Sequence, residues 1–285
     1  MVLAAGDIAC DPTDASYNGG TGTASACQQV ATANELTGTV AVLPLGDDQY
    51  NAASLSQFQQ IYDPSWGRAK AITYPASGNH EYMTAGASGY YTYFGSAASP
   101  QDAGCTASCK GYYSYNLGAW HLIALNSECT SVAGGCAAGS PQEQWLAADL
   151  AAHPHVCTLA YWHRPLFSSG ASLGDAAVHD LWADLYNAHA DLVLNGHDHD
   201  YERFAPQDPS GNADATNGLT EIVVGTGGDS HLGFRTTAAN SAVRNNTTYG
   251  VLKLTLHPTS FAWQFLPDTH SGNGSFTDAG SQACH

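Results

Sequence analysis

The sequence predicts an α/β fold in which two mixed sheets pack face to face and helices lie on the outside. In the first part of the chain, short apolar runs typical of buried strands alternate with segments of helical periodicity. Towards the carboxyl terminus, strands follow one another without helices between them. The 285 residues contain no break in composition and no Pro-rich linker, so we expect one domain spanning residues 1–285.

Five apolar runs in the first part are predicted to be strands, and each is followed by polar side chains. The runs span residues 2–5, 40–45, 71–76, 157–162 and 191–194. The motifs that follow them are Gly6-Asp7, Gly46-Asp47-Asp48-Gln49-Tyr50, Gly78-Asn79-His80-Glu81, His163-Arg164-Pro165 and Gly196-His197-Asp198-His199. Open α/β sheets collect their ligands at the carboxyl ends of strands. Oxygen and imidazole donors without a thiolate suit a pair of hard or borderline cations.

Helices are expected at residues 27–36, 54–61, 140–150 and 175–189, where apolar side chains recur at helical spacing. The third has a start signal, with Ser140 as N-cap, Pro141 at N1 and Glu143 at N3. In the first, Val30, Ala33 and Leu36 are expected to share a face.

The remaining strands are expected at residues 220–226, 249–256 and 260–265, and the last two form a hairpin. Residues 82–116 are rich in Gly, Ala, Ser and Tyr. We expect a surface excursion beside the metal-bearing strand ends, which at this length is commonly functional. The alternative is a decorative insertion held by a bond between Cys105 and Cys109.

The formal net charge is −17, with only 8 Lys and Arg residues. Such a surface repels nucleic acid and anionic membranes, so neither is expected as a partner. A small phosphate ester remains compatible, because bound metal ions reverse the local field. The sequence contains no transmembrane run, and it leaves the oligomeric state open.

Eight cysteines, none of them in a CxxC pair, predict a disulfide framework and therefore an oxidising compartment. Eight cysteines allow 105 pairings. Short loops favour Cys105–Cys109 and Cys129–Cys136, which leaves Cys10–Cys27 and Cys157–Cys284. We expect a secreted or periplasmic protein whose signal peptide has been removed or lies outside this sequence.

The five strand-end motifs together resemble the calcineurin-like metallophosphoesterases, and within them the purple acid phosphatases. The discriminating feature is Tyr50, three residues after Asp47. The segments Asp200-Tyr201-Glu202-Arg203, Gly111 to Gly118 and Gly225-Thr226-Gly227-Gly228 are similar to the same group. The resemblance implies a four-layer α/β/β/α sandwich of two mixed sheets with a dinuclear metal centre between the sheet ends.

The resemblance also implies a division of the ligands. Asp7, Asp47, Tyr50 and His199 would hold a trivalent iron. Asn79, His163 and His197 would hold a divalent zinc, manganese or iron, and the Asp47 carboxylate would bridge the two ions. Two carboxylates and a phenolate suit the harder ion, whereas an amide and two imidazoles suit the divalent one.

The expected reaction is hydrolysis of a phosphate monoester by a hydroxide that the metals activate. His80 is expected to protonate or stabilise the leaving group, and Arg164 to bind the substrate phosphate or to support its loop through a salt bridge. Glu81 either orients the His80 ring or is a buried structural carboxylate. Asp48 is expected to support the bridging residue from behind or to lie at the surface.

Three alternatives remain open from the sequence. If Tyr50 is a packing residue, the centre could hold two divalent ions. The chain could instead be a phosphodiesterase of the same superfamily. A third alternative is a non-catalytic secreted module in which the same ligands bind metal or phosphate in an inert site.

Overall fold

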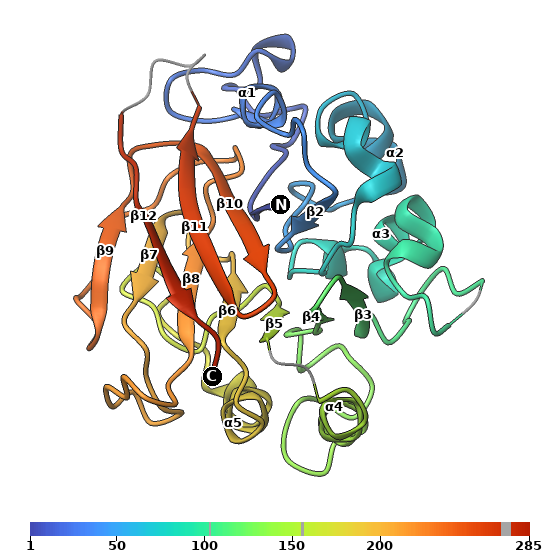
Figure 1. Cartoon of the computed structure of the whole chain (residues 1–285). Helices are drawn as coiled ribbons and strands as arrows, with labels where there is room; N and C mark the ends of the chain where they lie inside the picture. The colour runs from blue at the N-terminus through green and yellow to red at the C-terminus, as the bar shows by residue number, and fades with distance from the viewer. Residues whose placement is uncertain (103, 155–156, 269–274) are drawn as a thin grey trace.

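Two mixed β-sheets lie at the centre of the computed structural model, which describes residues 1–102, 104–154, 157–268 and 275–285. The first sheet contains β1 (Val2–Ala5), β2 (Ala41–Pro44), β10 (Gly250–His257), β11 (Ser260–Pro267) and β12 (Ala279–Ala283). Its spatial order is β12-β11-β10-β1-β2, with β1 parallel to β2 and antiparallel to β10. The first and last parts of the chain therefore build one sheet (Figure 1).

The middle of the chain builds the second sheet. Its strands are β3 (Tyr113–Leu117), β4 (Trp120–Ala124), β5 (Cys157–Tyr161), β6 (Leu192–Asn195), β7 (Tyr201–Phe204), β8 (Thr220–Val224) and β9 (Ser241–Asn245). They lie in the order β3-β4-β5-β6-β8-β7-β9, and β4, β5, β6 and β8 run parallel.

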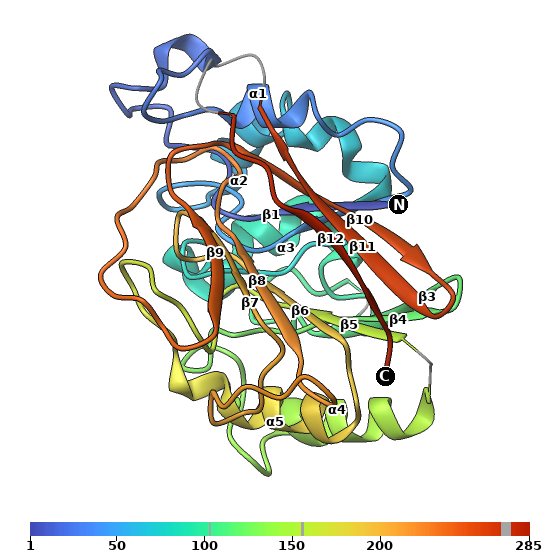
Figure 2. The same cartoon turned by 60° about the vertical axis from the view of Figure 1, so that its left-hand side comes forward.

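Helical segments flank the two sheets. The α-helices are α1 (Gln29–Ala33), α2 (Leu55–Gln57), α3 (Ser88–Phe94), α4 (Pro141–Ala152) and α5 (His179–Asn187). A π-helical segment, η2 (Phe58–Tyr62), continues α2, and the 3-10 helices are η1 (Asn18–Gly20), η3 (Trp66–Ile72), η4 (Glu81–Met83), η5 (Ala85–Ala87), η6 (Gly95–Ala97) and η7 (Ala176–Val178). Figure 2 shows α4 and α5 on one side of the molecule and α1 on the opposite side, with the sheets between them.

The core extends over both faces of the sheets, because successive side chains of a strand point to opposite faces. In β5, Leu159 and Tyr161 join the core between the sheets, whereas Ala160 packs with Leu146 of α4 and Trp182 of α5. On the far side of the first sheet, Trp66 and other residues of the N-terminal helices pack against β1 and β2. This arrangement confirms the predicted α/β/β/α sandwich. Among the described residues, no helix has both the length and the apolar character that a membrane span requires.

The four predicted disulfides are present, namely Cys10–Cys27, Cys105–Cys109, Cys129–Cys136 and Cys157–Cys284. The predicted hairpin is also correct, with β10 and β11 paired from Gly250 opposite Pro267 to His257 opposite Ser260. Ser140 caps α4 as expected, because its hydroxyl accepts a hydrogen bond from the Glu143 N–H at 3.2 Å. The Glu143 carboxylate, however, accepts from the Gly139 N–H instead of closing on Ser140.

The predicted strand at residues 71–76 is wrong in its first half. Ala71 and Ile72 end η3, and only the following residues run beside β2, through N–H groups of Tyr74 and Ala76. The N–H groups on either side of Pro75 make these bonds, whereas Pro44 of β2 has no N–H to return one, which keeps this stretch from becoming a regular ladder.

Two further expectations need correction. Residues 82–116 are not a surface excursion throughout, because α3 buries Tyr90, Tyr91 and Phe94 in the core. The helix expected at residues 27–36 is only α1, and Val30 is 40% exposed instead of sharing a buried face with Ala33. A helix this short presents one buried turn and cannot build the long stripe that the spacing indicated.

Candidate metal centre

The carboxyl ends of four strands, two from each sheet, bring the predicted ligands together. Asp7 lies two residues beyond β1 and Asp47 three beyond β2. His163 lies two residues beyond β5, and His197 and His199 follow β6. Because β1 is parallel to β2 and β5 is parallel to β6, each pair of ends lies at one edge of its sheet. The cluster therefore forms where the edges of the two sheets meet.

Tyr50 connects three of these side chains. Its hydroxyl lies 2.8 Å from Asp7 Oδ1, 3.2 Å from Asp47 Oδ2 and 3.0 Å from His199 Nε2. The ring is 4% exposed, so these contacts exclude water. Tyr50 thus lies inside the polar cluster, in the position that a ligand would occupy.

The three histidines complete the cluster. His163 Nε2 is 3.1 Å from both Asp47 Oδ2 and His197 Nδ1, and His199 Nε2 is 3.4 Å from Asp7 Oδ1. The opposite nitrogens of His163 and His199 lie 2.9 Å from the carbonyl oxygens of Leu45 and Ser230. A carbonyl accepts only from a ring N–H, so both Nε2 lone pairs can face the cluster. Backbone carbonyls commonly orient metal-binding histidines in this way.

Asn79 has a buried amide oxygen for which the described part of the chain supplies no hydrogen-bond partner. Leaving such an oxygen unpaired costs about 1–3 kcal/mol. The neighbouring backbone belongs to the cluster, since the His80 N–H donates to Asp47 Oδ1 at 2.7 Å. An amide oxygen in this position fits coordination of a cation.

Two glycines allow the motifs to approach one another. A Cβ at Gly46 would lie 2.7 Å from the Cβ of His163, and a Cβ at Gly78 would lie 2.4 Å from Asp47 Oδ1. Neither contact is sterically possible without a shift of the site. The Gly residue that precedes Asp47 or Asn79 in its motif is therefore a packing requirement of the cluster.

Three cluster residues have left-handed backbone conformations that L-residues rarely adopt. The φ angles are +59° at Asp7, +49° at Asp47 and +72° at His197. Each costs of the order of 1–3 kcal/mol, and such strain concentrates at functional sites. The folded chain holds these three residues in conformations that aim their side chains at one point.

The charges of the cluster are strongly coupled. Burial raises the pKa of Asp7. Burial would do the same at Asp47, but the charge and hydrogen bond of His163 outweigh it and hold that pKa below its ordinary value. Burial would lower the pKa of His163, but Asp47 raises it to about 10, so without a metal this imidazole keeps a proton on Nε2 that a bound ion would displace. Burial, with His163 and Arg164, lowers the pKa of His197 to about 2, so this imidazole is neutral, as a metal ligand must be.

The two predicted catalytic residues lie at the edge of the cluster. His80 Nε2 is 3.9 Å from Asp47 Oδ2, its Nδ1 is 2.6 Å from the Asn51 carbonyl oxygen, and its ring packs on Tyr50 at 4.2 Å. Arg164 donates from Nε to Glu128 at 2.8 Å, and its Nη1 lies 3.1 Å from His197 Nε2. Both side chains are partly exposed, at 20% and 26%, and so can be reached from solvent.

The structure decides between the alternatives left open for two carboxylates. Glu81 does not contact the His80 ring; its carboxylate accepts the N–H groups of Asp47, Asp48 and Gly78 at 2.7–3.0 Å. It therefore fixes the turn that carries Asp47, which agrees with the structural alternative. Asp48 is fully buried and does not lie at the surface.

Glu128 was not predicted from the sequence as a site residue, although it follows an apolar strand as the predicted residues do. It follows the apolar run of β4, as Asp7, Asp47 and His163 follow theirs. Ser230, whose carbonyl faces His199, gives no such signal, because its role depends on a backbone oxygen.

The donor set fits metal ions. The ligand atoms of Asp47, His163 and His197 lie within 4.8 Å of one another. Tyr50, Asp7 and His199 adjoin them, and Asn79 supplies the unpaired buried oxygen. Carboxylate, phenol, amide and imidazole donors without a thiolate are typical of iron, zinc and manganese sites.

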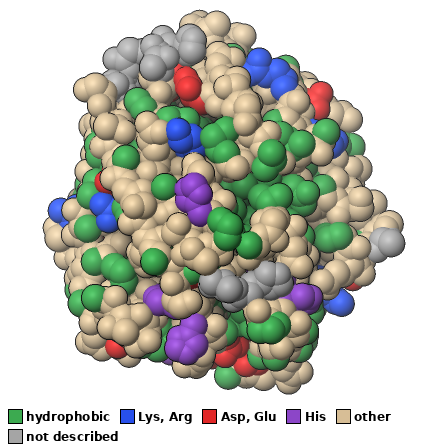
Figure 3. Space-filling view, in the orientation of Figure 1, with side chains coloured by type: hydrophobic (Ala, Val, Ile, Leu, Met, Phe, Trp, Pro, Cys, Tyr) green, Lys and Arg blue, Asp and Glu red, His purple; other side chains and the backbone are tan. Residues whose placement is uncertain are grey.

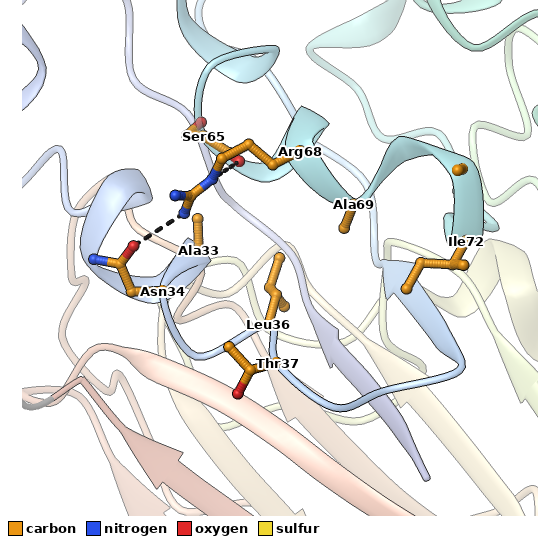
Figure 4. A pocket seen from close by; sticks show the side chains of 9 residues that line it. Ala33, Asn34, Leu36, Thr37, Ser65, Arg68, Ala69 and Ile72 are labelled. Atoms are coloured by element: carbon orange, nitrogen blue, oxygen red, sulfur yellow. Dashed lines mark hydrogen bonds between the residues drawn. The ribbon is translucent and has the colours of Figure 1, made fainter.

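A surface cavity of about 490 Å³ lies elsewhere, between α1 and η3 (Figure 4). Its lining consists mostly of Ala, Leu, Ile, Ser, Thr and Asn side chains. Its one Arg, Arg68, donates to Asn34 Oδ1 and to the Ser65 carbonyl oxygen, both at 3.0 Å. Because the cavity shares no residue with the cluster and has no catalytic side chain, we assign the chemistry to the cluster.

Comparison with known proteins agrees with this assignment. A model of the calcineurin-like phosphoesterase family matches residues 2–201. Human acid phosphatase type 7 is 30% identical over 193 residues, covering 58% of this chain and 41% of that protein. Purple acid phosphatase 15 of Arabidopsis thaliana is 30% identical over 163 residues, covering 50% and 29%. The chain thus spans less than half the length of these curated relatives.

Among solved structures, the purple acid phosphatase PPD1 from yellow lupin seeds has the same fold, with a TM-score of 0.74 and 20% identity over 99% of this chain and 53% of that one. PhoD matches with a TM-score of 0.66 and 11% identity, covering 99% and 69%. The predicted resemblance to purple acid phosphatases is confirmed. With the family model spanning all five strand-end motifs, the chain belongs to the calcineurin-like phosphoesterases.

Proposed function

We propose that this chain is a phosphatase that hydrolyses phosphate monoesters at a dinuclear metal centre within a single domain of residues 1–285. The observation that carries the proposal is the convergence of carboxylate, phenol and imidazole donors where the two sheets meet. The similarity to acid phosphatases supports the same class of reaction.

The proposed ligands divide into two sets. Asp7, Asp47, Tyr50 and His199 would hold a trivalent iron, while Asn79, His163 and His197 would hold a divalent zinc, manganese or iron. Asp47 Oδ2 supports a bridging role, because it lies 3.2 Å from the Tyr50 hydroxyl and 3.1 Å from His163 Nε2. One carboxylate therefore borders both sets.

When bound, two such ions polarise phosphoryl oxygens and lower the pKa of water towards neutrality. His80 would supply the proton for the leaving group. The Asn51 carbonyl accepts its Nδ1–H, so Nε2 is the ring nitrogen that faces the cluster and would carry the transferred proton. A positioned histidine of this kind contributes typically 10²–10⁴-fold to a rate.

Arg164 would bind the substrate phosphate. Glu128 fixes its Nε, and the contact of Nη1 with His197 brings the guanidinium to the edge of the proposed divalent site. A guanidinium held in one orientation offers its N–H groups to phosphate oxygens with little loss of entropy.

The surroundings of the site support a small substrate in an oxidising compartment. Four disulfides are typical of secreted or periplasmic proteins. A net charge of −17 disfavours nucleic acids, whose phosphates this surface repels.

The test compares hydrolysis of an aryl phosphate monoester with that of the matching diester, across pH, on metal-replete protein. Faster monoester hydrolysis is expected. Faster diester hydrolysis would replace the proposal with a phosphodiesterase, and turnover of neither would leave a binding module. A visible tyrosinate-to-iron absorption band is expected, and a colourless, fully active protein would refute the Tyr50–iron pair.

A further inference from the structure

A second group of metal-ligating side chains lies far from the proposed phosphatase centre. It consists of His121, the second residue of β4, together with Asp149 and His153 at the carboxyl end of α4. Their ligand atoms all lie within 4.8 Å of one another. Two imidazoles and one carboxylate are a donor set that suits zinc and neighbouring transition metals.

The two centres lie at opposite ends of the same sheet. His121 is paired with Thr158 of β5, five residues before His163. At 3.3 Å per residue in a parallel strand, this separation is about 16 Å. An ion bound beside His121 would therefore touch no residue of the proposed phosphatase centre.

The distances within the group are close to those of a coordinated ion. Asp149 uses one carboxylate oxygen for each imidazole, with 2.7 Å from Oδ2 to His121 Nε2 and 3.2 Å from Oδ1 to His153 Nδ1. Two donors at about 2.0 Å from a tetrahedral zinc are roughly 3.3 Å apart. The His153 pair already has this separation, and the His121 pair needs to open by about 0.6 Å. His153 Nδ1 also lies 2.9 Å from the Asp149 carbonyl oxygen and donates to it, so its proton has to move to Nε2 when Nδ1 binds the ion.

Surrounding groups hold these ligands in place. Asn116 Oδ1 lies 2.7 Å from His121 Nδ1, so the other ring nitrogen points at Asp149. The Ser114 hydroxyl donates to Asp149 Oδ1 at 2.7 Å. Such outer partners orient metal ligands and raise affinity.

The local electrostatics favour a cation. Burial would raise the pKa of Asp149, but the hydrogen bonds from His121 and Ser114 outweigh burial and lower it, so this side chain is a carboxylate. The group lies at the carboxyl end of α4, where the helix dipole is negative. The His153 side chain is 41% exposed, which leaves a path for entry and room for water as a further ligand.

We propose that His121, Asp149 and His153 bind one divalent transition-metal ion, of which Zn²⁺ is the best match. The ion clamps the end of α4 to β4 and stabilises this side of the seven-stranded sheet. Binding displaces the proton between His121 Nε2 and Asp149 Oδ2 to solvent. The rival interpretation is a hydrogen-bonded group that keeps this proton and binds no metal.

The experiment measures Zn²⁺ bound per chain, by equilibrium dialysis and elemental analysis, together with the melting temperature. The unchanged chain is compared with its His153→Ala variant, which changes an exposed side chain. We expect the variant to bind one Zn²⁺ fewer and to lose part of the Zn²⁺-induced rise in melting temperature, with phosphatase activity unchanged. Asp149→Asn, which retains an acceptor for Ser114, is expected to give the same loss.

His179→Ala is the matched control, because His179 is also exposed, at 47%, and also faces a carboxylate, that of Asp180 at 3.1 Å. It should bind as much Zn²⁺ as the unchanged chain. Equal uptake by the unchanged chain and His153→Ala would overturn the proposal, as would the same loss in His179→Ala. Repeating the comparison in an Asp47→Asn background separates the two centres, because the difference due to His153 should persist there.

Discussion

Asp47 is the residue on which both proposed metal positions depend, because its Oδ2 borders Tyr50 on one side and His163 on the other. Asp47→Asn keeps the shape but removes the negative charge that two cations require. We expect loss of bound metal and loss of turnover by about 10²-fold or more, because even the partners behind metal ligands contribute up to about 10²-fold to affinity or activity. Metal content and the rate with an aryl phosphate measure both effects.

Asp48→Asn is the matched control for this substitution. Asp48 is the adjacent residue and is equally buried, but its carboxylate has no hydrogen-bond partner among the described residues. Burial raises its pKa well above the ordinary value, so the neutral amide replaces a group that resists ionisation. Retention of metal is expected in Asp48→Asn, and full activity in Asp47→Asn would contradict the assignment.

A separate prediction concerns His80, which lies beside the cluster but is not one of the proposed metal ligands. Its Nε2 is 3.9 Å from Asp47 Oδ2, longer than the contacts between the proposed ligands. His80→Ala should therefore keep the metals and lose about 10²–10⁴-fold in turnover. The loss should be smaller for a substrate whose leaving group needs no proton, such as a nitrophenolate. Loss of metal in this variant would instead make His80 a ligand.

At the scale of single elements, the sequence predicts the site better than the segments around it. The motifs after β1, β2, β5 and β6 were identified because a polar residue directly after an apolar strand is a local signal. The error at residues 71–76 arose because Tyr74-Pro75-Ala76 runs beside β2 while η3 precedes it. The helix α3 was not predicted, because its Tyr and Gly residues are typical of loops. In the folded chain these residues pack in the core.

Other features depend on contacts that no local pattern contains. The pairing of β1 with β10 joins segments about 250 residues apart in the chain. The short polar strands β7, β9 and β12 are strands only because a neighbouring strand supplies their hydrogen bonds. The partners of the cluster, such as the Ser230 carbonyl behind His199, likewise follow from the folded structure.

Strand β8 carries a buried acid that should make the stability of the fold depend on pH. Burial raises the pKa of Glu221 to about 8, from 4.5 in the unfolded chain. Its Oε1 accepts the Leu166 N–H at 3.1 Å, while Oε2 has no partner among the described residues. Between these two pKa values the folded state binds more protons, so the free energy of unfolding falls as pH rises and stays low above pH 8.

Glu221→Gln removes this titration and keeps an acceptor for Leu166. The variant should gain stability relative to the unchanged protein as pH rises, by roughly 2–5 kcal/mol between pH 5 and pH 9. Urea unfolding at these two pH values measures the difference. A difference between the two proteins that is the same at both pH values would show that Glu221 does not titrate in this range.

At the scale of the whole molecule, the two sheets are joined covalently as well as by their common core. Cys157, the first residue of β5 in the seven-stranded sheet, is bonded to Cys284, which directly follows β12 of the five-stranded sheet. The bond closes a loop of 127 residues, whereas Cys105–Cys109 closes one of 4 residues. The two bonds therefore restrict the unfolded chain to very different extents.

Loop-closure entropy predicts that removing the long-range bond costs about 5 kcal/mol, and removing the short one about 2 kcal/mol. We expect the double variant Cys157→Ala and Cys284→Ala to unfold at much lower urea concentration than the double variant Cys105→Ala and Cys109→Ala. Cys157 is also fully buried, so the loss of its sulfur from the core adds to the effect. Equal losses in the two variants would mean that the core, and not the Cys157–Cys284 bond, holds the sheets together.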